Sequence, residues 1–121
     1  MNILILGSGG REHAMAAAVK KSPHNHQVFI MPGNAGTDSI GRNIPMNLEN
    51  FEDVKNFATK HFVDLIICGP EAPLAKGIAD AFSRDPETRD IAFIGPGQRA
   101  ARLESSKDFA KAFMQRHGIP T

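Results

Sequence analysis

The fold of this chain is decided by its first strand-to-helix turn, Ile3-Leu4-Ile5-Leu6-Gly7-Ser8-Gly9-Gly10-Arg11-Glu12-His13. Four apolar residues predict a short buried strand, three glycines follow, and helix-forming residues resume from Ala14 to Lys21. This order brings backbone N–H groups to a helix N-terminus, where the helix dipole favours an anion. The turn therefore predicts a phosphate cradle, in which Gly9 and Gly10 let the ligand approach the backbone and Arg11 is free to pair with its charge.

The same turn matches the dinucleotide fingerprint G-x-G-x-x-G only in part. Glu12 stands where the third glycine of that fingerprint would fall. A nicotinamide site would also need an acidic residue after the second strand to hold the ribose diol, and this chain has Met31-Pro32-Gly33 there. The turn favours a phosphate ligand over a dinucleotide, and its structural alternative is a tight turn with solvated Arg11 and Glu12.

Apolar runs and helical periods alternate along the chain. They predict strands at 2–6, 27–31, 63–68 and 91–94, with a weak strand near 43–46 that Pro45 disfavours. They predict helices over 11–22, 73–83, 97–103 and 106–117, and one after Asn50 whose apolar face carries Phe51, Val54, Phe57, Ala58 and Phe62. This alternation predicts an α/β, three-layer, Rossmann-like fold with a mostly parallel sheet of about five strands.

Each well-defined strand ends in a glycine-bearing loop, at 7–10, 32–36, 69–73 and 95–97. Ligands of parallel sheets bind beyond the carboxyl ends of the strands, near the point where strand order reverses. The four loops are therefore expected along one edge of the sheet. That edge is the predicted site.

The second of these loops contains four candidate ligand contacts, Gly33, Asn34, Ala35 and Gly36. The Asn34 amide could meet a sugar hydroxyl, and the glycines would keep the surface open. An ordinary loop is an equally good interpretation of these residues.

Glu71 lies between Pro70 and Pro73 in the third loop. The two prolines stiffen this loop, so the carboxylate is expected to be held where it can bind an amine or hydroxyl of a ligand. Its alternative role is that of an acidic residue in the first turn of the next helix, where the dipole favours it.

Composition excludes several classes of function. A net charge of +1 gives no reason to expect nucleic acid or an anionic membrane as a partner. No run approaches the roughly 20 apolar residues of a membrane span, and no secretory signal precedes the first strand. The single cysteine, Cys68, is expected as a buried, reduced thiol in a cytoplasmic protein. His24 and His26 have no third ligand nearby in the sequence, so no metal site is expected, and no catalytic residue is identified.

Four segments resemble the amino-terminal domain of the phosphoribosylamine–glycine ligase family, within the ATP-grasp superfamily. They are Gly7 to His13, Pro32 to Thr37, Gly69 to Leu74, and Leu103 to Lys107 with the tail His117 to Thr121. The resemblance runs from the first residue to the last. The motifs G-S-G-G-R-E-H and G-P-E-A-P-L, in this order, are specific for this family within its superfamily.

The resemblance implies a pre-ATP-grasp domain spanning residues 1–121 of a purine-biosynthesis ligase. Such a ligase joins glycine to 5-phosphoribosylamine, using ATP with Mg²⁺ or Mn²⁺, and no cofactor would be tightly bound to this part alone. In the family this domain helps to hold phosphoribosylamine, which suits a phosphate cradle at Gly7–Glu12 and a sugar-facing loop at Gly33–Gly36, with Glu71 near the ribose or amine.

Lys107 corresponds to a lysine that reaches ATP phosphates in the family, where Gly-Ser-Lys is common and this chain has Ser105-Ser106-Lys107. The resemblance also implies ATP-grasp and carboxy-terminal domains after Thr121, on which this domain docks, so the chain alone is expected to be inactive. The alternatives are a non-catalytic phosphate- or nucleotide-binding module and the dinucleotide-binding domain of an oxidoreductase.

Overall fold

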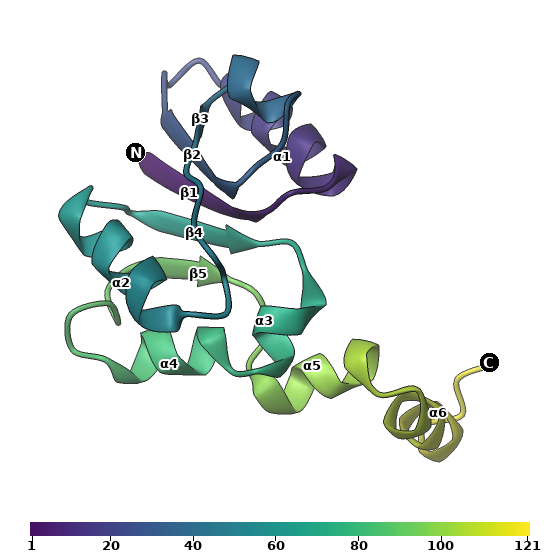
Figure 1. Ribbon diagram of the computed structural model, residues 1–121. Coiled ribbons are helices and arrows are strands. Elements are labelled where there is room, and N and C mark those ends of the chain that lie inside the picture. Colours follow the sequence, from purple (N-terminus) through teal and green to yellow (C-terminus); the bar gives the residue numbers. More distant parts are fainter.

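The computed structural model describes residues 1–121 (Figure 1). Its strands are β1 (Asn2–Gly7), β2 (Gln27–Pro32), β3 (Arg42–Asn43), β4 (Leu65–Cys68) and β5 (Ala92–Ile94). Its helices are α1 (Gly10–Lys20), the 3-10 turn η1 (Thr37–Ser39), α2 (Phe51–Lys60), α3 (Glu71–Ala75), α4 (Ile78–Arg84), α5 (Gln98–Ser105) and α6 (Lys107–Arg116). No helix combines the length and the apolar character needed to cross a bilayer.

The five strands form one sheet in the order β3-β2-β1-β4-β5, and all neighbouring pairs are parallel. The predicted α/β fold is therefore confirmed. The chain builds outward from β1 through β2 to β3, then returns to place β4 on the other side of β1. Strand order reverses between β1 and β4, so a ligand site is expected beyond the carboxyl ends of these two strands.

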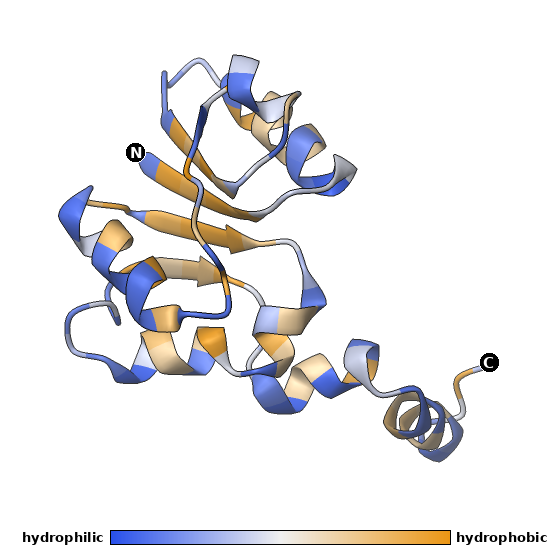
Figure 2. Ribbon diagram, viewed as in Figure 1, coloured by the Kyte–Doolittle hydropathy of each residue, from blue (hydrophilic) through white to orange (hydrophobic).

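Alternate residues of β1 enter two separate cores, one on each face of the sheet. Ile3 and Ile5 pack with Ala16 of α1, whereas Leu4 and Leu6 join the larger core beneath α2, α3 and α4. Figure 2 shows the strands as the most apolar part of the ribbon. Burying each such side chain contributes about 1.5–3 kcal/mol, so the cores hold the strand ends in fixed positions.

The α1 side of the sheet is covered incompletely. Helix α1 contacts β1 and β2, while β4 and β5 lie beyond it on that face. As a result Leu65 and Ile67 are only partly buried and Ile94 is 55% exposed. Leu65, Ile67 and Ile94 thus form an apolar strip that α1 leaves open on this face of the sheet.

Helix α2 begins as predicted, because the Asn50 side chain accepts a hydrogen bond from the Asp53 N–H at 3.2 Å. Its apolar face buries Val54, Phe57 and Ala58, but the prediction that Phe62 belongs to that face is wrong. The helix ends at Lys60, and Phe62 adopts a φ of 53° and is 79% exposed. This turn lets Val63 N–H donate to Ala58 O at 2.9 Å and puts Val63 into the core instead.

The single helix predicted over 73–83 is also corrected. It starts earlier, at Glu71, and is split into α3 and α4. Gly77 lies between them with a φ of 91°, a left-handed conformation that ends a helix and favours glycine. The weak strand near 43–46 forms only at Arg42–Asn43, upstream of Pro45, which lacks the N–H that a sheet requires.

Candidate functional site

A cleft of about 390 Å³ lies at the point where strand order reverses. The loops after β1 and β4 form it, and no hydrophobic residue lines it. Its lining residues are Ser8, Gly9, Gly10, Arg11, Glu12, Gly69, Pro70 and Glu71. The structure thus brings the first and third predicted loops together, although about 60 residues separate them in the sequence.

Glu12 is 5% exposed and is one of the residues that line this cleft. Its Oε2 accepts a hydrogen bond from the Gly9 N–H at 3.2 Å, an arrangement that caps helix α1. A Cβ atom at Gly7 or at Gly69 would collide with the Glu12 carboxyl group. The residue that breaks the dinucleotide fingerprint therefore favours glycine both at the end of β1 and directly after β4, and Gly7 also has a φ of 130°.

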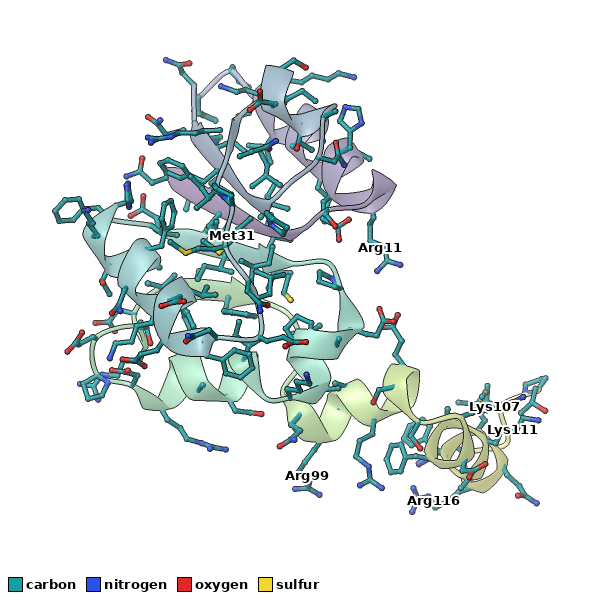
Figure 3. All side chains as sticks on the ribbon, in the orientation of Figure 1. Arg11, Met31, Arg99, Lys107, Lys111 and Arg116 are labelled. Carbon is teal, nitrogen blue, oxygen red and sulfur yellow. The ribbon has the colours of Figure 1, made fainter.

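Arg11 crosses from helix α1 to the loop after β4. Its Nη1 donates to the Gly69 carbonyl oxygen at 3.0 Å, and Figure 3 shows the side chain extending from the start of the helix. This contact uses one N–H group of the guanidinium to join the two loops, and the expectation that Arg11 pairs with ligand charge stays a prediction.

Glu71 is the first residue of α3, and its side chain is exposed and makes no hydrogen bond or ion pair within the chain. The two roles expected for it coincide, since it lines the cleft and also stands in the first turn of a helix. Its carboxylate is open to a donor from a ligand.

Asn34 connects the second predicted loop to the first. Its Oδ1 accepts from the N–H groups of Gly36 at 2.8 Å and Thr37 at 3.0 Å. Its Nδ2 donates to the carbonyl oxygens of Ser8 at 2.9 Å and Gly9 at 3.4 Å. The amide expected to meet a sugar hydroxyl is thus used within the chain, where it joins the loop after β2 to the loop after β1.

The rest of this loop is held from β3. Thr37 is fully buried, and its Oγ1 donates to Asn43 Oδ1 at 2.7 Å. A Cβ at Gly33 would collide with Asn43, and Gly33 has a φ of 78°. Gly33 therefore serves loop closure, the Gly36 N–H is held by Asn34, and Ala35 is exposed at the tip of the loop.

A second cleft, of about 240 Å³, adjoins the first and shares Ser8 and Pro70 with it. Its remaining lining residues are Gly7, Pro32, Leu48, Glu49, Ala72, Pro73 and Lys76. Lys76 Nζ lies 3.7 Å from Glu49 Oε1, in an exposed ion pair that contributes at most about 1 kcal/mol. Sequence reasoning missed Leu48, Glu49 and Lys76, because no motif marks them and only the fold brings them to this edge.

Two predicted elements stay outside both clefts. The loop 95–97 lies at the same edge, but it lines neither cleft and instead continues into Gln98, whose N–H donates to Asp80 Oδ2 at 2.7 Å. Lys107 opens α6, which Figure 3 shows projecting from the body and well separated from Arg11. The Ser106 hydroxyl caps this helix by accepting from the Phe109 N–H at 3.3 Å.

Cys68 is buried and unpaired, as predicted. Burial, and secondly the nearby charge of Glu12, raise the pKa of its thiol from 9.0 to about 12. At pH 8 the thiolate fraction is therefore about a thousandfold below that of an ordinary cysteine. We expect iodoacetamide to label Cys68 very slowly in the native chain and rapidly in urea, as measured by mass spectrometry. Equal labelling rates in the two conditions would contradict this.

A family model described as phosphoribosylglycinamide synthetase, N domain, matches residues 1–104. A phosphoribosylamine–glycine ligase from Ralstonia nicotianae is 48% identical over 123 residues, which cover 100% of this chain and 28% of that protein. The trifunctional purine biosynthetic protein adenosine-3 of Gallus gallus is 46% identical over 121 residues, covering 98% of this chain and 12% of that protein. The chain thus spans about a quarter of the length of its ligase relatives.

A solved structure that is similar to this chain bears the same name as the ligase relatives. The crystal structure of a phosphoribosylamine–glycine ligase from Thermotoga maritima is similar to this chain with a TM-score of 0.65 and 34% identity. The similarity covers 100% of this chain and 26% of the solved one.

Proposed function

This chain belongs to the phosphoribosylglycinamide synthetase N-domain family, and on that premise we propose that it is the substrate-binding domain of a phosphoribosylamine–glycine ligase. The family match over residues 1–104 is the observation that carries the proposal. The relatives favour a ligase over the dinucleotide-binding domain of an oxidoreductase, and Glu12 in place of the third fingerprint glycine agrees with that choice.

The proposed reaction joins glycine to 5-phosphoribosylamine. ATP transfers its terminal phosphoryl group to the glycine carboxylate, which yields ADP and glycyl phosphate. The amine of phosphoribosylamine then attacks the acyl carbon and expels phosphate, which gives glycinamide ribonucleotide. ATP would bring Mg²⁺ or Mn²⁺ with it. Within this chain no three His, Cys, Asp or Glu side chains converge on a metal position, so we place the metal with ATP, outside these residues.

We place phosphoribosylamine at the two adjoining clefts of the carboxyl edge. The backbone of Gly9 and Gly10, the Arg11 and Glu12 side chains, and Glu71 would contact it directly, since all of them line the cleft between β1 and β4. The second loop (Gly33, Asn34, Ala35 and Gly36) would act by holding Ser8 and Gly9 in place and by offering its tip to the ligand. Lys107 would contact ATP from α6, by family resemblance.

The proposed ligase also contains domains beyond these residues. We propose that ATP-grasp and carboxy-terminal domains complete the site, that this chain alone is inactive, and that the enzyme is cytoplasmic. The open apolar strip beside Ile94, and helix α6 projecting from the body, are surfaces that further domains could cover.

The test is the activity of the full open reading frame that contains this chain. We expect ADP formation that requires both glycine and phosphoribosylamine, with a product whose mass equals that of glycinamide ribonucleotide. In hydrogen exchange, ribose 5-phosphate should slow the amides of residues 8–12. Gly9 and residues 34, 36 and 37 are less informative, because hydrogen bonds already hold their amides.

Three outcomes would count against the proposal. Absence of substrate-dependent ADP formation would remove the ligase activity. Binding of ribose 5-phosphate with no ADP formation would leave a non-catalytic phosphate-binding module. Micromolar binding of NADH would favour the oxidoreductase alternative.

A further inference from the structure

Charged groups determine what the cleft between β1 and β4 can accept. Two carboxylates line it, Glu12 and Glu71, against a single arginine. That arginine, Arg11, already donates to the Gly69 carbonyl oxygen at 3.0 Å. The cleft therefore has more acceptor than donor capacity, which suits ligand groups that carry N–H or O–H.

The two carboxylate oxygens of Glu12 have different environments. Oε2 accepts the Gly9 N–H at 3.2 Å, whereas Oε1 accepts no hydrogen bond from the chain. No fully buried side-chain oxygen lacks a partner, so Oε1 is not sealed off. Glu12 is one of the residues that line the cleft and is only 5% exposed, and Oε1 lies against Gly7 and Gly69 as an acceptor that the chain leaves unused.

A carboxylate of the chain itself already lies at the N-terminus of helix α1. The Glu12 carboxyl group accepts the N–H of Gly9, the N-cap residue, close to the N–H groups that bind phosphate in glycine-loop sites. A phosphate placed on the N–H groups of Gly10 and Arg11 would lie beside this carboxylate. Like charges repel strongly where little water separates them, so this geometry argues against the phosphate cradle that the glycines predict.

We propose that Glu12 is a specificity-determining residue: its free Oε1 accepts a hydrogen bond from the amine or a ribose hydroxyl of the ligand, and its charge keeps the phosphate away from helix α1. This inference rests on the proposed function and adds the orientation of the ligand. The amine-bearing sugar faces Glu12 and Glu71, and the phosphate lies farther along the edge.

Glu12→Gln in the full-length protein tests this directly. The variant keeps the shape of the side chain, and its amide oxygen is required by the Gly9 N–H. Its NH₂ group must then take the place of Oε1, so an acceptor becomes a donor and a negative charge is lost. We expect KM for phosphoribosylamine to rise about tenfold with a smaller change in kcat, and inorganic phosphate to inhibit more tightly than in the wild type. Glu104→Gln, the same change on the exposed surface of α5, should alter neither value.

Other outcomes overturn the inference. If both constants stay at wild-type values, Glu12 only supports the loop. If KM for phosphoribosylamine falls, the phosphate sits on the helix after all. If the active wild-type enzyme passes the ligase test and Glu12→Gln behaves like Glu104→Gln, this inference alone fails. If the wild type forms no ADP, the proposed function fails, and the inference fails with it because it rests on that function.

A measurement on the wild-type protein covers the case in which Glu12→Gln does not fold. We expect inorganic phosphate alone to leave hydrogen exchange at Gly10 and Arg11 unchanged, while ribose 5-phosphate slows it. Protection of these two amides by phosphate alone would overturn the inference without any variant.

Discussion

Gly69→Ala is expected to destabilise the chain by roughly 2–3 kcal/mol, at the upper end of what overpacking costs. The cause is local, since a Cβ at this position would collide with the Glu12 carboxyl group, whose residue is 5% exposed and whose Oε2 is held by the Gly9 N–H. Gly69 is not among the glycines with positive φ, so its backbone would otherwise accept alanine. Urea unfolding of the chain, followed by circular dichroism, measures the loss.

If the collision is the cause, removing the Glu12 side chain should restore part of the stability that Gly69→Ala loses. A purely conformational role of Gly69 does not predict this rescue. Glu12→Ala alone should cost about 1–2 kcal/mol through loss of the cap. The double variant with Gly69→Ala should be more stable than the sum of the two single losses by at least about 1 kcal/mol. Gly10→Ala is the control on the same cleft, because a Cβ there has no neighbour within 4 Å. Additive losses in the double variant would disprove the proposed contact.

Asn34→Ala is expected to cost roughly 2–4 kcal/mol, because four side-chain hydrogen bonds are lost at once and each contributes about 0.5–1.5 kcal/mol. The loops after β1 and β2 would lose their connection through Ser8 and Gly9. Faster hydrogen exchange at Gly36 and Thr37 should accompany the loss of stability.

Two further variants make this prediction specific. Asn34→Asp keeps the acceptor for Gly36 and Thr37 but loses both donors to the first loop, so its cost should be intermediate. Asn47→Ala removes one exposed hydrogen bond, to the Glu49 N–H at 2.9 Å, and should cost less than about 1 kcal/mol. An Asn34→Ala variant as stable as Asn47→Ala would contradict the role given to Asn34.

Local sequence signals were sufficient to predict a helix or strand where its own residues determine where it begins and ends. Asn50 marks the start of α2, and the apolar run before Gly7 marks β1, because capping and periodicity are properties of a few consecutive residues. The same reasoning failed at Phe62 and across 73–83. At both places one residue in a left-handed conformation, Phe62 or Gly77, ends the helix, and the apolar period continues past it in the sequence.

The sequence by itself determined the α/β class, the edge of the sheet that carries the site, and the glycine loops that form it. Strand–helix alternation has few solutions, and parallel strands place their carboxyl ends together. Only the tertiary structure decided that β4 lies beside β1, and this pairing makes one cleft of Gly9–Glu12 and Gly69–Glu71. It also decided what Glu12, Arg11 and Asn34 do, because each partner beyond the first turn comes from a distant loop. Whether a polar side chain faces a ligand or its own backbone depends on which unpaired backbone groups the fold brings near it.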